Sequence, residues 1–514
     1  MSIRRSVPRH IGAAVLIILG TPAAHDAHAQ TTAAAAVGQG DHQQDAPSAD
    51  KPQPALVMGA MMREGSGTSW LPDTTPMYAI HRQSGPWTLM AHENVFVQFL
   101  RDSGSRGERQ LGSINWVMGM AARDAGDGHL GLRSMFSLEP WTIRGCGYPD
   151  LLASGEKCRG EMIHDRQHPH DFAMELAVEY DAPVAGTTRW QVYGGPAGEP
   201  ALGPVAYPHR ISAMPNPLAP ITHHWLDSTH IAFGVVTGGL YGKLWKAEAS
   251  VFNGREPDER RTDFDFGPLE SVSGRVWWLP TANLAFQLST SRLKEAEAAD
   301  GEAPRTGVKK ITASGTYHSA FRANGIWATT VGWGRNAETG GRATDALLIE
   351  TNLTVDDRDT LFGRLEVVGK SSHDLALDTI ADTMTVGKVQ GGFTRYAPSW
   401  RGFKPGLGAE VSAGFVPREL QVVYGRRVNV GFGVFVTLRP AAMVMAAGTA
   451  TARTMVMVQT AFDPSKLSCS PPFDPRNAAA TTYQGKTYYF CSVEDRDRFL
   501  TDPAMSLSMM PPKQ

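Results

Sequence analysis

The sequence predicts an all-β protein: an antiparallel transmembrane β-barrel of about 14 strands, within a range of about 12–16, followed by a small α+β module. Three observations predict this fold. The chain begins with an export signal, most of it alternates apolar with small or polar residues, and the alternating runs are roughly 9–12 residues long. The 514 residues carry 49 basic and 51 acidic side chains, a net charge of −2. This balance gives no basic surface for nucleic acid, so we expect no nucleic-acid partner.

The first part of the chain has the features of a secretory signal. Arginines among the first nine residues are followed by the apolar run Ile11–Gly20 and by small residues at Ala27–Ala29. The apolar run is shorter than the roughly 20 residues that a membrane helix needs. We therefore expect residues 1–29 to be a cleaved signal peptide. Residues 30–60 are rich in Ala, Gln, Asp and Pro, a composition that predicts disorder.

Residues 61–440 are predicted to form the barrel. In Val428–Leu438, "VNVGFGVFVTL", large apolar residues alternate with Asn, Gly and Thr, and in Thr360–Val368 they alternate with Arg364 and Glu366. A period of two indicates strands with two different faces. A soluble β-sandwich would bury the apolar faces, but its strands average about 5–6 residues, whereas membrane strands need about 9–11. The longer runs favour a barrel in the outer membrane, with apolar faces toward lipid and polar faces toward a lumen.

Cys146 and Cys158 lie in a loop-like run, "RGCGYPDLLASGEKCRG". Their spacing fits no standard zinc pattern. In an exported protein, two such cysteines indicate a disulfide that closes a short loop.

Two histidine- and aspartate-rich stretches lead into predicted strands. In "HDRQHPHDFAMELAVEY" the alternation from Asp171 to Tyr180 predicts a strand with its carboxylates in the lumen. In "HHWLDSTHIAFGVV" a strand is predicted from Thr229, with His230 pointing inward. The two stretches are then expected to face each other across the lumen. The candidate metal ligands are His168, His170, Asp171, His223, His224, Asp227 and His230.

Imidazole and carboxylate groups suit Zn²⁺ and Cu²⁺, and they suit equally a pore lining that is hydrogen-bonded internally. Both interpretations stay open at this stage. Catalysis would need a nucleophile held beside a base. Ser212 and Ser228 are available, but no nucleophile-elbow motif surrounds either serine. We therefore expect that the protein is not an enzyme.

Four motifs carry a resemblance to a protein family. They are "MREGSGTSWLPD", "DRQHPHD", "DSTHIAFGVVTGG" and "FNGREPD". Together they resemble an uncharacterised family of proteobacterial outer-membrane barrel proteins that accompany copper and other heavy-metal resistance systems. The resemblance implies a barrel and a metal-related role, without a known activity.

Residues 463–514 resemble the YHS domain, a small cysteine-dependent metal-binding module. The resemblance rests on Cys469, on "YQGKTYYFCS" and on the flanking Asp-Pro and Arg-Phe pairs. Where the family has a further cysteine, this chain has Asp495. The resemblance implies two alternatives: Cys469, Cys491 and Asp495 bind a copper or zinc ion, or the two cysteines form a disulfide.

Residues 441–462 contain four methionines that alternate with small residues. Thioethers bind Cu(I), but methionine in a strand more often only packs. We expect a linker or one extra hairpin here.

These patterns predict an outer-membrane barrel protein that takes part in binding, passage or resistance of copper or another heavy metal. The expected partners are outer-membrane lipid, metal ions and a periplasmic metal-handling protein, with the C-terminal module in the periplasm. A copper or zinc ion is the only cofactor that these patterns indicate. The first alternative is a general porin or structural envelope protein without a metal role, and the second is an outer-membrane hydrolase.

Overall fold

A computed structural model describes residues 63–297, 306–322, 325–341, 343–377 and 383–441, with short pieces at 444–445, 457–459, 479–483, 486–490, 496 and 499. The predicted signal peptide, residues 30–60, most of 441–462, and the predicted ligands Cys469, Cys491 and Asp495 lie outside the described residues.

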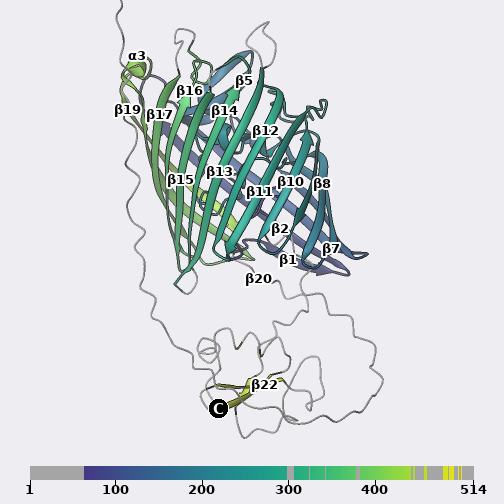
Figure 1. Cartoon of the computed structure of the whole chain (residues 1–514). Coiled ribbons are helices and arrows are strands. Elements are labelled where there is room, and N and C mark those ends of the chain that lie inside the picture. Colours follow the sequence, from purple (N-terminus) through teal and green to yellow (C-terminus); the bar gives the residue numbers. More distant parts are fainter. Residues whose placement is uncertain are drawn as a thin grey trace, which may run out of the picture. The chain divides into compact units, whose positions relative to one another are not determined.

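Sixteen antiparallel strands form a closed barrel in the described part of the chain (Figure 1). Each wall strand pairs with its neighbours in sequence, and β19 closes the barrel on β2. The barrel prediction is confirmed, with the strand number at the upper limit of the expected range. The wall strands are β2 (Trp87–Asp102), β3 (Arg109–Ala125), β4 (Gly128–Phe136), β7 (Ala173–Ala185), β8 (Thr188–Ala197), β9 (Val235–Tyr241), β10 (Trp245–Phe252), β11 (Ser271–Thr281), β12 (Leu284–Glu297), β13 (Thr306–Phe321), β14 (Gly325–Glu338), β15 (Ala343–Val355), β16 (Asp359–Lys370), β17 (Met384–Tyr396), β18 (Phe403–Phe415) and β19 (Val428–Pro440).

Short elements accompany the wall. The strand β1 pairs with the first part of β2, and β5 pairs with β6 as a separate hairpin. No helix in the described part of the chain is long and apolar enough to cross a membrane. These short elements are β1 (Ile80–Ser84), α1 (Glu139–Thr142), β5 (Tyr148–Cys158), β6 (Glu161–Gln167), α2 (His223–Leu226), η1 (Ser228–His230), η2 (Arg418–Leu420), α3 (Gln421–Tyr424) and β20 (Val444–Met445).

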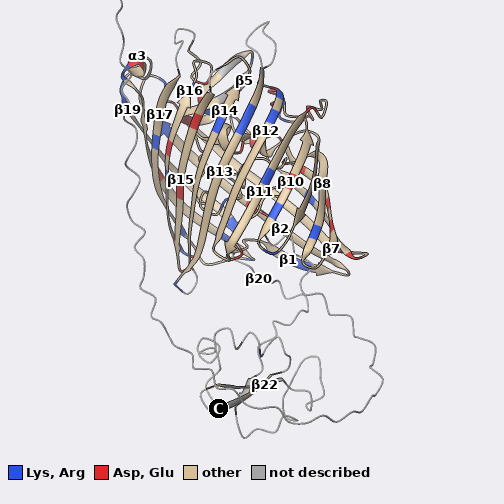
Figure 2. Ribbon diagram, in the orientation of Figure 1, with Lys and Arg blue, Asp and Glu red and all other residues tan. Residues whose placement is uncertain are grey.

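The polarity of the wall is the reverse of that of a soluble protein. In β19, Val430, Phe432 and Val434 are exposed, whereas Asn429 and Thr437 on the opposite face of the strand are buried. Acidic and basic residues are interspersed along the strands rather than separated by sign (Figure 2). A sheet with apolar residues outside and polar residues inside is stable when lipid surrounds it. The predicted orientation of the alternating faces is thus confirmed.

Two predicted strand details differ from the structure. Glu175 and Glu179 of β7 face inward as expected, but Met174 is buried too, because a β-bulge opposite Met135 shifts the register there. The strand predicted from Thr229 begins only at Val235. The residues before it form short helices and turns that contact the inside of the wall, which period-two reasoning does not foresee.

The two ends of the barrel carry different connections. Residues 126–127 and 186–187 form tight turns at one end, where β1 lies. Residues 137–172, 198–234 and 253–270 connect strands at the opposite end, which carries β5 and α3 in Figure 1. Outer-membrane barrels have short periplasmic turns and longer extracellular loops.

A small three-stranded sheet lies in the later part of the chain. Its strands are β21 (Met457–Gln459), β22 (Ala479–Tyr483) and β23 (Lys486–Phe490), with β23 in the middle. Phe499 packs against Tyr483, Tyr488 and Phe490, and both phenylalanines are fully buried. This sheet includes part of the segment that resembles a YHS domain.

Candidate functional site in the barrel lumen

Three segments fold into the lumen: residues 63–79, 137–172 and 198–234. Nearly all side chains of 198–234 are buried. The cavities left between these segments include one of about 40 Å³ and one of about 80 Å³. Such spaces hold only a few water molecules. The lumen is therefore largely filled.

The segment 198–234, which we call the inserted segment, is attached to the inner wall by charged groups. The Arg210 guanidinium bridges Asp227 of the same segment and Glu350 of β15, with both N–O distances 2.6 Å. Arg210 and both carboxylates are almost fully buried. Further hydrogen bonds of 2.8–2.9 Å join the inserted segment to the wall: Asn352 to the Ile211 carbonyl, Arg364 to the Leu218 carbonyl, Trp225 to Thr344, and Asn94 to the Met214 carbonyl.

Two glycines allow this path. A Cβ atom at Gly334 of β14 would lie 2.5 Å from the Trp225 carbonyl oxygen, so only glycine lets α2 approach the wall so closely. Gly234, with φ of +98°, turns the chain from the inserted segment into β9. Small inward-facing residues of the wall thus leave room for the inserted segment.

The N-terminal segment 63–79 is anchored to β4 and β10. Glu64 accepts a hydrogen bond of 2.9 Å from Arg133 of β4, and Lys246 of β10 donates one of 2.6 Å to the Thr68 carbonyl. Trp70 is 1% exposed. The first of the four family-like motifs therefore lies inside the barrel.

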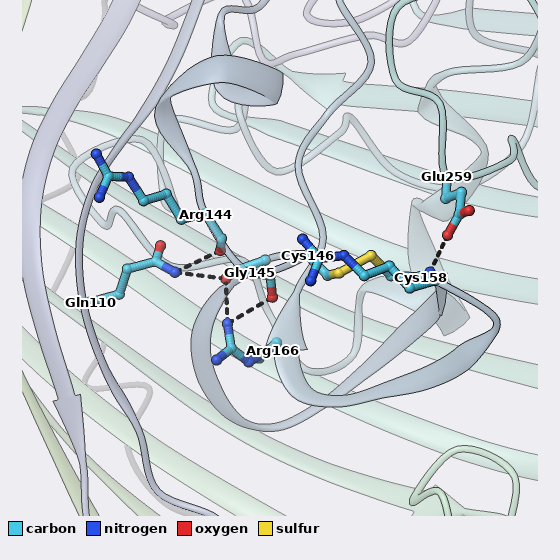
Figure 3. Close-up of a disulfide and its surroundings, with 9 residues drawn as sticks. Gln110, Arg144, Gly145, Cys146, Cys158, Arg166 and Glu259 are labelled. Atoms are coloured by element: carbon cyan, nitrogen blue, oxygen red, sulfur yellow. Dashed lines mark hydrogen bonds between the residues drawn. A yellow bond between two sulfur atoms is a disulfide. The ribbon is translucent and has the colours of Figure 1, made fainter.

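The predicted disulfide between Cys146 and Cys158 is confirmed, and it joins a residue just before β5 to the last residue of β5 (Figure 3). The Arg166 guanidinium donates to the Gly145 carbonyl at 2.9 Å, and the Gln110 amide donates to the Arg144 carbonyl at 2.7 Å. These bonds fix the hairpin against β3.

The structure brings the two predicted histidine stretches together, as expected. The His230 ring lies 5.3 Å from the His170 ring and 5.1 Å from the His223 ring, measured between centroids. The Tyr207 hydroxyl is 3.0 Å from His170 Nε2. His170 comes from the segment 137–172 and the others from the inserted segment. We call His170, His223, His230 and Tyr207 the imidazole cluster.

Acceptors hold one nitrogen of each ring. His170 Nδ1 lies 3.0 Å from Glu139, and His223 Nδ1 lies 2.8 Å from Asp227. His230 Nδ1 lies 2.8 Å from the backbone carbonyl of Asp227. Because these partners accept hydrogen bonds, they favour the proton on Nδ1. In a neutral ring this leaves the lone pair on Nε2, which in His170 faces the Tyr207 hydroxyl. Metal-ligating histidines are oriented in this way.

The predicted carboxylate ligands instead form ion pairs. Asp227 binds Arg210 and His223, and Asp171 lies 3.4 Å from Arg261. Within the described residues, the only group of three His, Cys, Asp or Glu with all ligand atoms within 4.8 Å of one another is Asp258, Asp263 and Asp265. The imidazole cluster thus contains nitrogen donors that suit a metal ion. In this structure these nitrogen atoms are too far apart to bind one ion together.

His168 and His224 extend the cluster outward, with ring centroids 6.4 Å apart. Both line the cavity of about 40 Å³, and the Nε2 atoms of His224 and His230 are buried without a hydrogen-bond partner. His168 also lines a vestibule of about 490 Å³ beside the disulfide. The vestibule is lined by the arginines 144, 159 and 261 and by Glu259. Its basic lining gives no electrostatic preference for cations, so cation selectivity has to come from ligation.

Burial lowers the pKa of His168, His224 and His230 well below the usual value, and nearby cationic groups lower it further. For His170, burial also opposes protonation, but the Glu139 carboxylate outweighs it and raises the pKa. His168, His224 and His230 are therefore neutral, the form in which imidazole binds metals, whereas the raised pKa of His170 favours its protonated form.

We predict that acidification loosens the lumen segments. A histidine with a lowered folded-state pKa binds fewer protons than the exposed residue, so its contribution falls as pH drops below about 6.5, by up to about 1.4 kcal/mol per pH unit. The raised pKa of His170 adds stability as pH falls from its folded-state pKa toward about 6.5, and its contribution stays constant below that pH. Below about 6.5, the three histidines with lowered pKa therefore determine the direction of the change. Amide exchange in residues 198–234, corrected for the intrinsic rate, should be faster at about pH 5.5 than at pH 7.5. Equal protection at both pH values would contradict this prediction.

The sequence reasoning missed Tyr207, Arg210 and Glu139. Tyr207 and Arg210 belong to "YPHR", whose aromatic, imidazole and guanidinium groups in a turn-rich stretch are a signal that could have found them. Glu139 begins the short helix α1, and no pattern marked it.

The closed wall, the apolar exterior and the polar interior define a transmembrane β-barrel of the outer-membrane type, with a largely filled lumen. Two similar solved structures are OmpF of Salmonella typhi in complex with daunomycin and an anion-selective porin from Comamonas acidovorans. The first has a TM-score of 0.45 and 8% identity, covering 70% of this chain and 100% of that chain. The second has a TM-score of 0.42 and 10% identity, covering 69% of this chain and 99% of that chain. No protein-family model and no curated protein matches the chain.

Proposed function

We propose that this outer-membrane barrel binds a divalent transition-metal ion, such as Cu²⁺ or Zn²⁺, at the imidazole cluster, and takes part in metal passage or resistance. The observation that carries this proposal is the set of three adjacent imidazoles whose Nδ1 atoms are all held by acceptors. Neutral imidazole is a preferred ligand of both ions. Binding of one ion requires the Nε2 atoms to move toward one another, and His170 Nε2 to exchange its contact with Tyr207 for the ion.

Metal affinity of the full-length protein, folded in detergent micelles, tests this proposal by competition with a chromophoric chelator. His230→Gln should weaken Zn²⁺ binding at least ten-fold, because His230 contacts both other rings. His164→Gln is the control, since this half-exposed ring contacts the neighbouring Asp165 and lies outside the cluster. Absence of Zn²⁺ and Cu²⁺ binding, or equal affinity in His230→Gln and wild type, would reject the proposal.

A general porin is the second candidate, because barrels of 16 strands enclose an aqueous channel in porins. Because three segments occupy the lumen, we expect the conductance of this barrel to be low. Steady conductance in planar bilayers, unaffected by Zn²⁺, would favour the porin.

An outer-membrane hydrolase finds less support. Ser212 hydrogen-bonds with Glu350 and Thr330, and Ser228 accepts a hydrogen bond of 2.9 Å from Lys310. Neither serine is held by a histidine base in these contacts.

We also propose that the segment after Pro440 enters the periplasm, with the YHS-like residues Cys469, Cys491 and Asp495 as a second metal-binding module. Support comes from β19, which ends at Pro440 on the side of the tight turns. The chain resembles a metal-resistance family and a YHS domain in the motifs quoted above, and both resemblances agree with this role.

A further inference from the structure

A second group of ligand-type side chains lies between β2, β3, the N-terminal segment and the inserted segment. It surrounds the cavity of about 80 Å³. The lining includes four methionines and two histidines: Met77, Met90, Met120, Met214, His92 and His209.

Wall and inserted segment meet at this cavity. His92 Nε2 of β2 lies 3.0 Å from Met118 Sδ of β3, so an imidazole nitrogen and a thioether sulfur are already adjacent. The His209 ring, from the inserted segment, lies 5.5 Å from the His92 ring and 4.7 Å from the Trp116 ring. The complete set of donors exists only while the inserted segment is docked.

Methionine commonly fills gaps in apolar cores, so packing alone is one explanation for the methionines at this cavity. Two observations go beyond packing. Glu93 Oε1, at the cavity, is buried without a hydrogen-bond partner. Both ring nitrogens of His81 are buried without partners as well, and His81, which is 4% exposed, pairs in register with Met90. Buried polar atoms without partners are rare in proteins, and a bound ion is one of their explanations.

Thioether and imidazole together select soft ions, because neither donor carries charge and sulfur is polarisable. We propose that a soft monovalent cation, Cu(I) or Ag(I), binds at this cavity, the thioether pocket, through His92 and His209, which line it, and through Met118, whose sulfur contacts His92 at its edge. The surrounding methionines supply further sulfur atoms. The site differs in donors and position from the imidazole cluster and does not depend on it. Tyr207 belongs to the imidazole cluster, and His209, two residues further along the chain, lines the thioether pocket.

Ag(I) is a suitable probe because it is diamagnetic and needs no reductant. We would titrate Ag(I) into the full-length protein in micelles, labelled with [methyl-¹³C]methionine, and follow the methyl resonances by NMR. The Met118 methyl should shift and saturate at about one equivalent. Met118→Leu, a swap that conserves volume, should weaken Ag(I) binding at least ten-fold.

Met135→Leu is the matched control, because Met135 is buried in the same apolar cluster, whereas the sulfur contact with His92 belongs to Met118. It should leave Ag(I) affinity within two-fold of wild type. His209→Gln provides a second variant that tests the imidazole donor. An unshifted Met118 methyl at one equivalent, or equal weakening by Met135→Leu and Met118→Leu, would overturn the proposal. Zn²⁺ affinity, measured on Met118→Leu, should stay unchanged, which separates this site from the imidazole cluster.

Discussion

Replacing Arg210 with alanine is expected to release the inserted segment from the wall. The guanidinium joins Asp227 and Glu350, both buried with it, and also donates to the Val205 carbonyl at 2.8 Å. Removing one partner of a buried ion pair leaves uncompensated charges and costs about 3–5 kcal/mol. The pKa of Asp227, which burial would raise, is held low by Arg210 and His223, so it should rise in the variant.

Single-channel conductance and amide exchange measure this effect. Arg210→Ala should increase conductance and accelerate exchange across residues 198–234, while the barrel strands remain protected. Arg260→Ala is the control, because its ion pair with Asp258 is exposed and such pairs contribute about 1 kcal/mol or less. Wild-type conductance and protection in Arg210→Ala would show that the inserted segment does not depend on this ion pair.

Replacing Val434 with arginine is expected to destabilise the barrel in lipid by about 2–4 kcal/mol. Val434 is 49% exposed at the middle of β19, on the apolar outer face. In a bilayer this position faces the hydrocarbon region, where a guanidinium loses its water. Urea unfolding of the protein reconstituted in vesicles measures the difference.

Val428→Arg is the matched control for position along the strand. Val428 lies on the same face and is 46% exposed, but it begins β19 at the end with the long connections. There the cost should fall to about 0–1 kcal/mol, because the side chain reaches the interface. Equal costs at both positions would contradict a lipid-embedded wall.

The wall was predictable because strand alternation is a local property of the sequence. Val428–Leu438 shows which side chains face lipid before any partner strand is known. The exact strand number was not predictable, since short strands such as β9, Val235–Tyr241, follow irregular stretches that also alternate for a few residues.

The candidate site was only partly predictable. The density of histidines pointed to His170, His223 and His230, and the two stretches do meet. Their partners Glu139 and Tyr207 come from stretches without such a density. The thioether pocket draws on β2, β3 and the inserted segment, so no single stretch of sequence contains it.

By itself, the sequence determined the strand pattern, its apolar outer face, the disulfide between Cys146 and Cys158, and the histidine-rich stretches. The tertiary structure alone decided that the lumen is filled and which side chains meet there. The physical reason is the range of the interactions. Alternation and loop closure act between residues close in sequence, whereas the Arg210–Glu350 bond joins residues 140 positions apart and forms only inside a closed barrel.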